Sequence, residues 1–311
     1  MAAYLLFFRG QWGSSYTASE TRFAIADTAA IARVVLTQTV QGEARTRIQL
    51  DRQPDGDTWL LDGQYPAFRP RVAQLLKALH LVQVRERLYD QGLVSAERIL
   101  RTMHTRIEVY DHDGRLMQDI YMGTPTKDAK GTLMQRAEAR TPYIVELPGL
   151  QGYVNASFPL EQVVWRENLL FRARRDQLAM VSVSYADAAR SFVLTRDTTT
   201  GAWLLGGAET PPDSARLAGY LDRFTGAVYA ETFATDRYPG MIDKLRTRQP
   251  DIVFSVATQQ GALRRIVLFT RDDNPNNLFG WVEGSDELLT IQHFVFDKYL
   301  VDRAYFLEIP L

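Results

Sequence analysis

The chain of 311 residues contains no cysteine. Disulfide bonds, thiol catalysis and cysteine-ligated metal ions are therefore excluded. The absence does not identify a compartment, because a chain of this length can be stabilised by its hydrophobic core without covalent cross-links.

The sequence also lacks an excess of either charge. Its 36 Lys and Arg residues stand against 37 Asp and Glu residues, so the formal net charge is -1. Nucleic-acid-binding domains usually carry a basic face or a high isoelectric point. The composition therefore gives no indication of a nucleic-acid partner.

Motifs of common catalytic and nucleotide-binding sites are absent as well. The sequence contains no HExxH, G-x-S-x-G, GxxxxGK[ST] or GxGxxG. The four histidines do not occur in pairs at metal-ligand spacing on one helix. We therefore predict no catalytic residues, no cofactor and a non-enzymatic function. A hydrolase whose carboxylates are scattered along the sequence stays an alternative.

One loop, RDDNPNN (271–277), is rich in oxygen-bearing side chains. Asp272, Asp273 and Asn274 are its candidate calcium ligands, because calcium prefers oxygen donors. Asp, Asn and Pro are also the residues of exposed turns. A turn is the interpretation that we favour, and the Asp-Gly pair at 113–114 predicts a hairpin turn for the same reason.

Basic residues are concentrated in RENLLFRARR (166–175). Arg172, Arg174 and Arg175 are candidates for docking an anionic group. A solvated linker between two halves of the chain is the interpretation that we favour.

The run Ala2–Phe8 is unbroken apolar and is followed by Arg9. A spanning helix needs about 20 apolar residues, so this run cannot cross a bilayer by itself. We interpret residues 1–21 as the stump of a truncated membrane anchor and its tether, with a buried N-terminal strand as the alternative. The anchor interpretation places the rest of the chain outside the cytoplasm.

Two stretches match each other at a constant offset: RIQLDRQPDGDTWLLDG (47–63) and SFVLTRDTTTGAWLLGG (191–207). Each predicts a strand, a polar turn and a second strand that ends at glycine. Each is followed by the apolar stripe of an amphipathic helix. The two stripes are Val72, Leu75, Leu76 and Leu79, and Leu217, Tyr220, Leu221 and Phe224.

This repetition predicts an α+β fold with two tandem, duplicated, strand-rich repeats over residues 22–171 and 172–311. Each repeat would be an antiparallel meander with one main amphipathic helix.

The run GTLMQRAEARTPYIVELPGLQGYVNASFPLEQVVWRENLLF (131–171) also carries a family likeness, together with FAIADTAAIARVVLT, WLLDGQYPA and SFVLTRD. The chain resembles the Bacteroidetes-type members of an uncharacterised bacterial domain-of-unknown-function family, over most of residues 22–230. The resemblance implies a membrane-spanning or lipoprotein-like N-terminal segment and a location in the periplasm or cell envelope. Some members are encoded beside gliding-motility-type ABC transporter components. The resemblance implies no catalytic residues.

Together these features predict a membrane-tethered, extracytoplasmic interaction or accessory module. Its partner would be an envelope or membrane protein, such as an ABC transporter subunit, which could add a strand to a free sheet edge. One alternative is a glycan- or lipid-binding protein with a cleft between the repeats. Its stacking candidates are Trp12, Trp59, Trp203 and Trp281. The hydrolase is the other.

Overall fold

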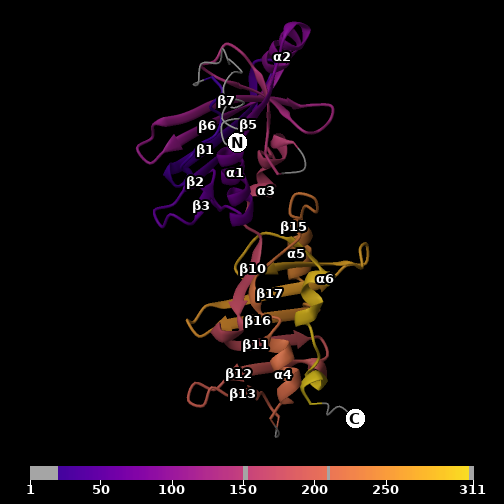
Figure 1. The fold of residues 1–311 in the computed structure, drawn as a ribbon. Coiled ribbons are helices and arrows are strands. Elements are labelled where there is room, and N and C mark those ends of the chain that lie inside the picture. Colours follow the sequence, from indigo (N-terminus) through magenta and orange to yellow (C-terminus); the bar gives the residue numbers. More distant parts are fainter. Residues whose placement is uncertain (1–19, 150–152, 209–210, 308–311) are drawn as a thin grey trace, which may run out of the picture. The chain divides into compact units, whose positions relative to one another are not determined.

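The computed structural model describes residues 20–149, 153–208 and 211–307 (Figure 1). The apolar run Ala2–Phe8, interpreted above as an anchor stump, lies outside these residues. None of the described helices is both long and apolar enough to cross a membrane. The chain divides between Glu167 and Asn168 into two compact units, unit 1 and unit 2.

Unit 1 is built on one antiparallel sheet of nine strands in the order β4-β3-β2-β1-β6-β7-β8-β9-β5. Its helices are α1 (Arg69–Leu81), α2 (Asp90–Thr102) and the short α3 (Gln162–Trp165), with 3-10 turns at Thr28–Ala30 and Val154–Ser157. The strands are β1 (Ile31–Val40), β2 (Glu43–Arg52), β3 (Trp59–Leu61), β4 (Tyr65–Pro66), β5 (Gln83–Arg87), β6 (Met103–Asp111), β7 (Leu116–Pro125), β8 (Thr132–Arg136) and β9 (Tyr143–Glu146).

The main core of unit 1 lies between one face of this sheet and α1. Successive side chains of a strand point to opposite faces, so Val34 and Leu36 enter the core together. Helix α1 begins with Pro70 in its first turn, where the missing N–H is tolerated. Its buried side chains are Val72, Leu75, Ala78 and Leu79. Three of them belong to the predicted stripe, whose fourth member, Leu76, is partly buried.

A smaller cluster lies on the opposite face of the sheet. Ala96 and Leu100 of α2 contact Leu133 of β8 and Ile144 of β9. Helix α2 therefore covers only one end of this face, which we call the outer face of the sheet.

Unit 2 contains an antiparallel sheet of eight strands, β13-β12-β11-β16-β17-β18-β19-β15, and a separate pair, β10-β14. Its helices are α4 (Ser214–Leu221), α5 (Met241–Arg246) and α6 (His293–Phe296), with 3-10 turns at Arg175–Gln177, Ala188–Arg190, Asp297–Tyr299 and Arg303–Phe306. The strands are β10 (Leu169–Arg174), β11 (Leu178–Tyr185), β12 (Phe192–Arg196), β13 (Trp203–Leu205), β14 (Thr225–Tyr229), β15 (Thr232–Phe233), β16 (Ile252–Thr258), β17 (Leu263–Thr270), β18 (Asn277–Val282) and β19 (Leu289–Gln292).

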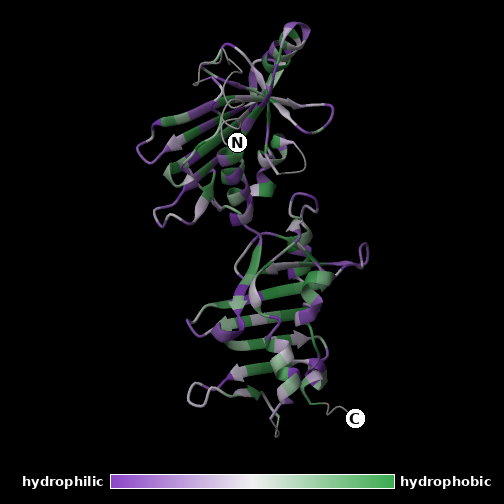
Figure 2. Cartoon of the chain, viewed as in Figure 1, coloured by the Kyte–Doolittle hydropathy of each residue, from purple (hydrophilic) through white to green (hydrophobic). Residues whose placement is uncertain are grey.

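Aromatic side chains fill the main core of unit 2. The ring of Phe171 lies 5.3 Å from that of Phe254 and 5.2 Å from that of Tyr299. The face of the eight-stranded sheet that points away from this core is the outer face of unit 2. There the rings of Phe269 and Trp281 stack with their centroids 5.3 Å apart, within a cluster that includes Leu245 of α5. Figure 2 shows the same division: hydrophobic colour gathers in the strands, and hydrophilic colour in many of the loops.

The predicted α+β class with two equivalent repeats is wrong. Strands hold 40% of the residues and helical segments 24%, so the fold is mostly β. Unit 1 has two helices of 13 residues, α1 and α2, instead of one main helix. In unit 2 the predicted helix ends early, because α4 stops at Leu221 and Phe224 lies beyond the turn that follows it.

The units also differ in strand number and in the extra β10-β14 pair. What the two large sheets have in common is a strand order, β3-β2-β1-β6-β7-β8-β9 in one and β13-β12-β11-β16-β17-β18-β19 in the other. The stretches 47–63 and 191–207 contribute β2–β3 and β12–β13 to these sheets.

Two glycines of unit 2 provide a test of its packing. A Cβ atom on Gly280 in β18 would lie 2.6 Å from the carbonyl oxygen of Val267, whereas one on Gly219 in α4 would meet nothing within 4 Å. We expect Gly280→Ala to lower the free energy of unfolding by about 1–3 kcal/mol. Gly219→Ala should raise it by about 0.5–1 kcal/mol, because alanine loses less backbone entropy in a helix. Urea unfolding of both variants measures this, and equal shifts would contradict the packing described.

Alkaline pH provides a second test. Burial raises the pKa of Tyr185 and of Tyr299 to about 12, from an ordinary value of 10.0. Between these values the unfolded chain loses phenolic protons that the folded chain keeps, so stability should fall as pH rises from 10 to 12. Urea unfolding across this range measures the decline. Tyr299→Phe should make it shallower, and an unchanged slope would contradict the assignment.

Candidate functional site

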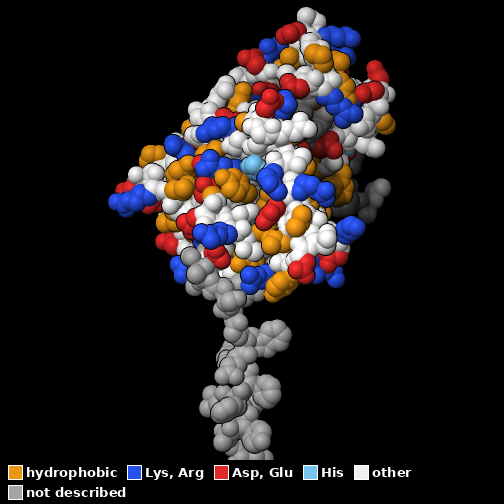
Figure 3. Space-filling model, turned by 90° about the horizontal axis from the view of Figure 1, so that it is seen from above, with side chains coloured by type: hydrophobic (Ala, Val, Ile, Leu, Met, Phe, Trp, Pro, Cys, Tyr) orange, Lys and Arg blue, Asp and Glu red, His pale blue; other side chains and the backbone are white. Residues whose placement is uncertain are grey.

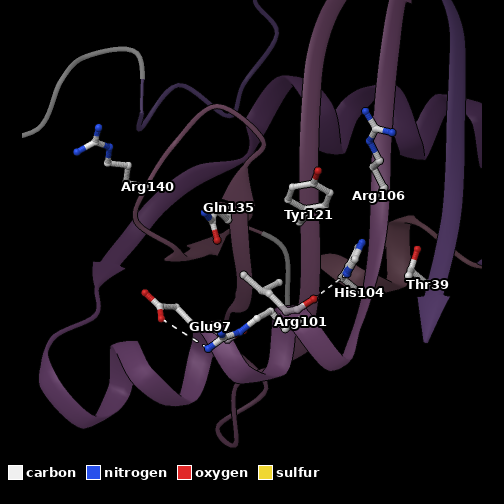
Figure 4. Close-up of a pocket in the computed structure, with 9 residues that line it drawn as sticks. Thr39, Glu97, Arg101, His104, Arg106, Tyr121, Gln135 and Arg140 are labelled. Carbon is white, nitrogen blue, oxygen red and sulfur yellow. Dashed lines mark hydrogen bonds and ion pairs between the residues drawn. The ribbon is translucent and has the colours of Figure 1, made fainter. Parts of the chain in front are cut away.

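A groove of about 590 Å³ opens in unit 1 between α2 and the outer face of the sheet (Figure 4). We call it the α2 groove. It is open to solvent rather than enclosed. Its lining residues come from β1, α2, β6, β7, β8 and the turn after β8: Thr39, Glu97, Leu100, Arg101, His104, Arg106, Tyr121, Gln135 and Arg140.

Strand alternation places the polar side chains of this groove. Ile107 of β6 enters the main core, so its neighbour Arg106 and the alternate residue His104 lie on the outer face. The register then aligns Arg106 with Tyr121, and Tyr121 with Gln135. Three strands therefore present one row of polar and aromatic side chains.

Helix α2 supplies the opposite wall. Because Leu100 is buried against the sheet, Glu97 and Arg101, one turn apart, lie at the edge of the helix (Figure 4). The Arg101 Nη2 to Glu97 Oε2 distance is 4.0 Å, and the Arg101 side chain is 78% exposed. Such an exposed pair holds Arg101 only weakly.

Arg106 is held firmly in comparison. Its Nε and Nη2 donate to the two carboxylate oxygens of Asp119 at 2.9 and 2.7 Å, and Nη2 lies 3.3 Å from Glu108. The hydrogen bond with Asp119 is the main reason why the pKa of Arg106 is raised. Arg106 therefore stays charged, and its fork is fixed in place by its partners.

The orientation of His104 follows from a hydrogen bond to the end of α2. Its Nδ1 lies 2.7 Å from the carbonyl oxygen of Leu100. Because a carbonyl only accepts, Nδ1 carries the proton and donates it. The ring also makes an edge contact with Tyr121, with centroids 4.9 Å apart. Nε2 is thus the nitrogen that can meet a ligand.

The turn after β8 carries the last cationic group. Gln135 Nε2 donates to the carbonyl oxygen of Ala139 at 2.8 Å and so ties this turn to β8. The neighbouring Arg140 is exposed. The lining of the α2 groove therefore includes three guanidinium groups, an imidazole and a phenol. Arg106 is already paired with Asp119 and Glu108, so the exposed Arg101 and Arg140 are the cations that can turn toward an anionic group.

The candidate calcium loop has the bonding of a surface turn. Both oxygens of Asp273 accept hydrogen bonds from Arg271, at 3.0 and 2.8 Å, which lowers the pKa of Asp273. Asn274 Oδ1 accepts from the backbone of Asn276, and Asp272 is exposed. Within the described parts of the chain, no three His, Asp or Glu side chains lie close enough together to hold a metal ion.

The three candidate docking arginines of 166–175 do not converge. Arg172 and Arg174 are exposed at alternate positions of β10, while Arg175 forms an ion pair with Asp222 beyond the end of the strand. Arg174 Nε lies 3.4 Å from Asp176. Two of the three cations thus already face carboxylates.

The two alternative hypotheses depend on exposed tryptophans for stacking a ligand and on carboxyl groups for hydrolysis. Trp59 and Trp281 are buried and Trp203 is half-buried in a core, whereas Trp12 lies outside the described residues. Where a carboxyl pKa is displaced, the shift is downward: hydrogen bonds in turns or to arginine lower those of Asp55, Asp128, Asp197 and Asp273. A general acid would need an upward shift.

The sequence motifs gave no indication of the α2 groove, and His104 has no histidine partner at metal-ligand spacing. The available signal was the alternation of polar and apolar residues in HTRIEVY (104–110), which marks a strand with one polar face. It does not identify α2 as the opposite wall.

Comparison with protein-family models, with curated proteins and with solved structures found no match. The resemblance to an uncharacterised bacterial family therefore stays a prediction from the residues quoted above. On the face shown in Figure 3, Lys and Arg side chains are interspersed with acidic and hydrophobic ones rather than gathered in one basic patch.

Proposed function

We propose that this protein is a non-enzymatic interaction module that binds an acidic segment of a partner protein in the α2 groove. The observation that carries this proposal is the set of cationic groups along the groove. Arg101 and Arg140 are exposed, and Arg106 is fixed in position by Asp119. Arg101 and Arg140 can therefore turn toward a carboxylate, which guanidinium groups bind well, while Arg106 stays paired with Asp119 and Glu108.

The open form of the groove favours a chain segment over a small ligand. Small-molecule sites usually bury most of the ligand surface, which an open groove cannot do. An extended or helical segment can instead lie along α2 with its acidic side chains toward the arginines, and the ring of Tyr121 offers it an apolar contact. Binding of this kind would be weak and sensitive to salt.

The edges of the two large sheets are less suitable for a partner. Strands β4 and β15 have two residues each, and β13 has three. Strand β5 has five, but it carries Arg85, Glu86 and Arg87, and a register shift interrupts its pairing with β9. Short, charged and bulged edges discourage strand addition. We therefore favour the groove over the edges.

The expected class of partner comes from the sequence. The family resemblance implies an envelope protein or a transporter subunit, and an acidic segment of such a protein would be the ligand.

A labelled peptide of alternating Asp, Glu and Gly residues tests the proposal. We expect it to bind the full chain at low ionic strength, as measured by fluorescence anisotropy. The double variant Arg101→Gln/Arg140→Gln should weaken binding roughly two- to thirtyfold, since each exposed ion pair contributes about 0.2–1 kcal/mol.

The matched control is Arg45→Gln/Arg115→Gln. It removes two exposed arginines from hairpin ends of the same unit and changes the net charge equally. This control should bind as the wild type does. If both double variants lost peptide affinity equally, the loss would be explained by net charge alone. That result would contradict a role for the α2 groove.

A further inference from the structure

Among the residues that line the α2 groove, His104 is the one whose type changes charge near neutral pH. The others that can carry charge are arginines, a glutamate and a tyrosine. Arginine stays charged throughout, carboxylates lose their charge near about pH 4 and tyrosine gains one near about pH 10, whereas imidazole titrates near about pH 6.5. Between about pH 5 and 8, the charge of the groove therefore depends on this one imidazole.

One nitrogen of the His104 ring is committed to helix α2. Nδ1 donates to the carbonyl oxygen of Leu100 at 2.7 Å. That carbonyl belongs to the last turn of α2, where carbonyl groups lack partners within the helix. A proton added at Nε2 leaves this bond in place, and the helix dipole stabilises a positive charge at the C-terminal end of a helix. The charged ring therefore fits its position without a rearrangement.

The other nitrogen, Nε2, has no hydrogen-bond partner among the described residues. In Figure 4 it points away from α2. Because Nδ1 carries the proton of the neutral ring, Nε2 is then an acceptor, and its lone pair repels a carboxylate. In the charged ring Nε2 carries a proton and donates to a carboxylate. Protonation thus reverses the sign of the interaction with an acidic ligand.

The charges around His104 are nearly balanced. The ring lines the α2 groove and also a second hollow, formed with the segment between β9 and α3. The titratable and charged groups of the two hollows are Glu97 and Arg101 of α2, Arg106 of β6, Tyr121 of β7, Arg140 of the turn after β8, and Tyr153 and Glu161 before α3. Thr39 of β1 and Gln135 of β8 are uncharged, and Arg106 is paired with Asp119 and Glu108. The carboxylates match the arginines in number, so no excess of positive charge opposes protonation of the ring.

On the basis of the proposed function, we infer that His104 makes the α2 groove sensitive to pH, and that a protonated ring strengthens the binding of an acidic segment. Aspartate and glutamate side chains titrate near about pH 4, so the ligand keeps its charge while the imidazole gains one. Affinity therefore rises as pH falls from about 8 to about 5.5. A contact made by the arginines alone would not change in this range, because they are charged throughout it.

The labelled peptide of alternating Asp, Glu and Gly residues tests this inference, by fluorescence anisotropy at about pH 5.5 and about pH 8 at one ionic strength. We expect the full chain to bind it about 1.5- to fivefold more tightly at the lower pH, which is the gain from one exposed ion pair. His104→Asn should bind equally at both pH values. Its amide nitrogen can take the place of Nδ1 as donor to the Leu100 carbonyl, while no group takes the place of Nε2. His104→Gln, which cannot be protonated either, should also bind equally at both.

The matched control is His112→Asn. His112 lies in the hairpin between β6 and β7 of the same unit, and its Nε2 is 3.2 Å from the carbonyl oxygen of Ala29. The variant removes one imidazole that does not line the α2 groove, so it should keep the difference between the two pH values. Circular dichroism establishes that each variant is folded.

Three results would overturn the inference and leave the proposed function in place: equal wild-type affinity at both pH values, a pH dependence that both His104 variants retain, or an equal loss of it in His112→Asn. The proposed function is tested separately at about pH 8, where the imidazole is neutral, by the loss of affinity in Arg101→Gln/Arg140→Gln. A peptide that binds the wild-type chain at neither pH would overturn both.

Discussion

The alternation of side chains along strands is the constraint on which both units depend. In each large sheet, one face is buried under helices and turns, and that burial fixes the register, because a shift by one residue would turn every core side chain to solvent. Leu36, Ile48 and Ile107 lie in the core of unit 1. The residues next to them along each strand must therefore lie on the outer face of the sheet. The composition of the outer face then determines what each unit can contact.

The two units use that face differently. In unit 1, β1, β2, β6 and β7 place arginines and carboxylates across from one another, and α2 covers one end. The α2 groove forms where this cover ends. Its cations differ in how firmly they are held, because Arg106 makes two hydrogen bonds to Asp119 while the Arg101 side chain is largely exposed.

Local patterns in the sequence predicted the local elements well. The spacing of Val72, Leu75 and Leu79 gave the buried side of α1, and the Asp-Gly pair at 113–114 gave the hairpin between β6 and β7, where Gly114 has φ of 76°. These signals are contained within about ten residues. The sequence does not indicate helix α2 clearly, because Gly92 and the charged residues of the helix interrupt a narrow apolar side. On that side only Ala96 and Leu100 are fully buried.

The class of the fold and the candidate site could not be predicted in the same way. The helical stripes are as clear in the sequence as the strand–turn–strand stretches, yet strands account for far more of the chain than helices do. The α2 groove is lined by residues as far apart in the sequence as Thr39 and Arg140. They come together because β1 pairs with β6, and the sequence near either residue does not predict that pairing.

The outer faces of the two large sheets differ in composition. Ion pairs lie across β1, β2, β6 and β7 of unit 1, whereas Phe269 of β17 and Trp281 of β18 stack on the outer face in unit 2. An acidic segment loses hydration when it binds, and only guanidinium groups that remain charged can offset that cost. A flat apolar surface, in turn, gains nothing on a face whose ion pairs it would have to desolvate. Under the proposed function, the outer face of unit 1 therefore favours a charged partner over an apolar one.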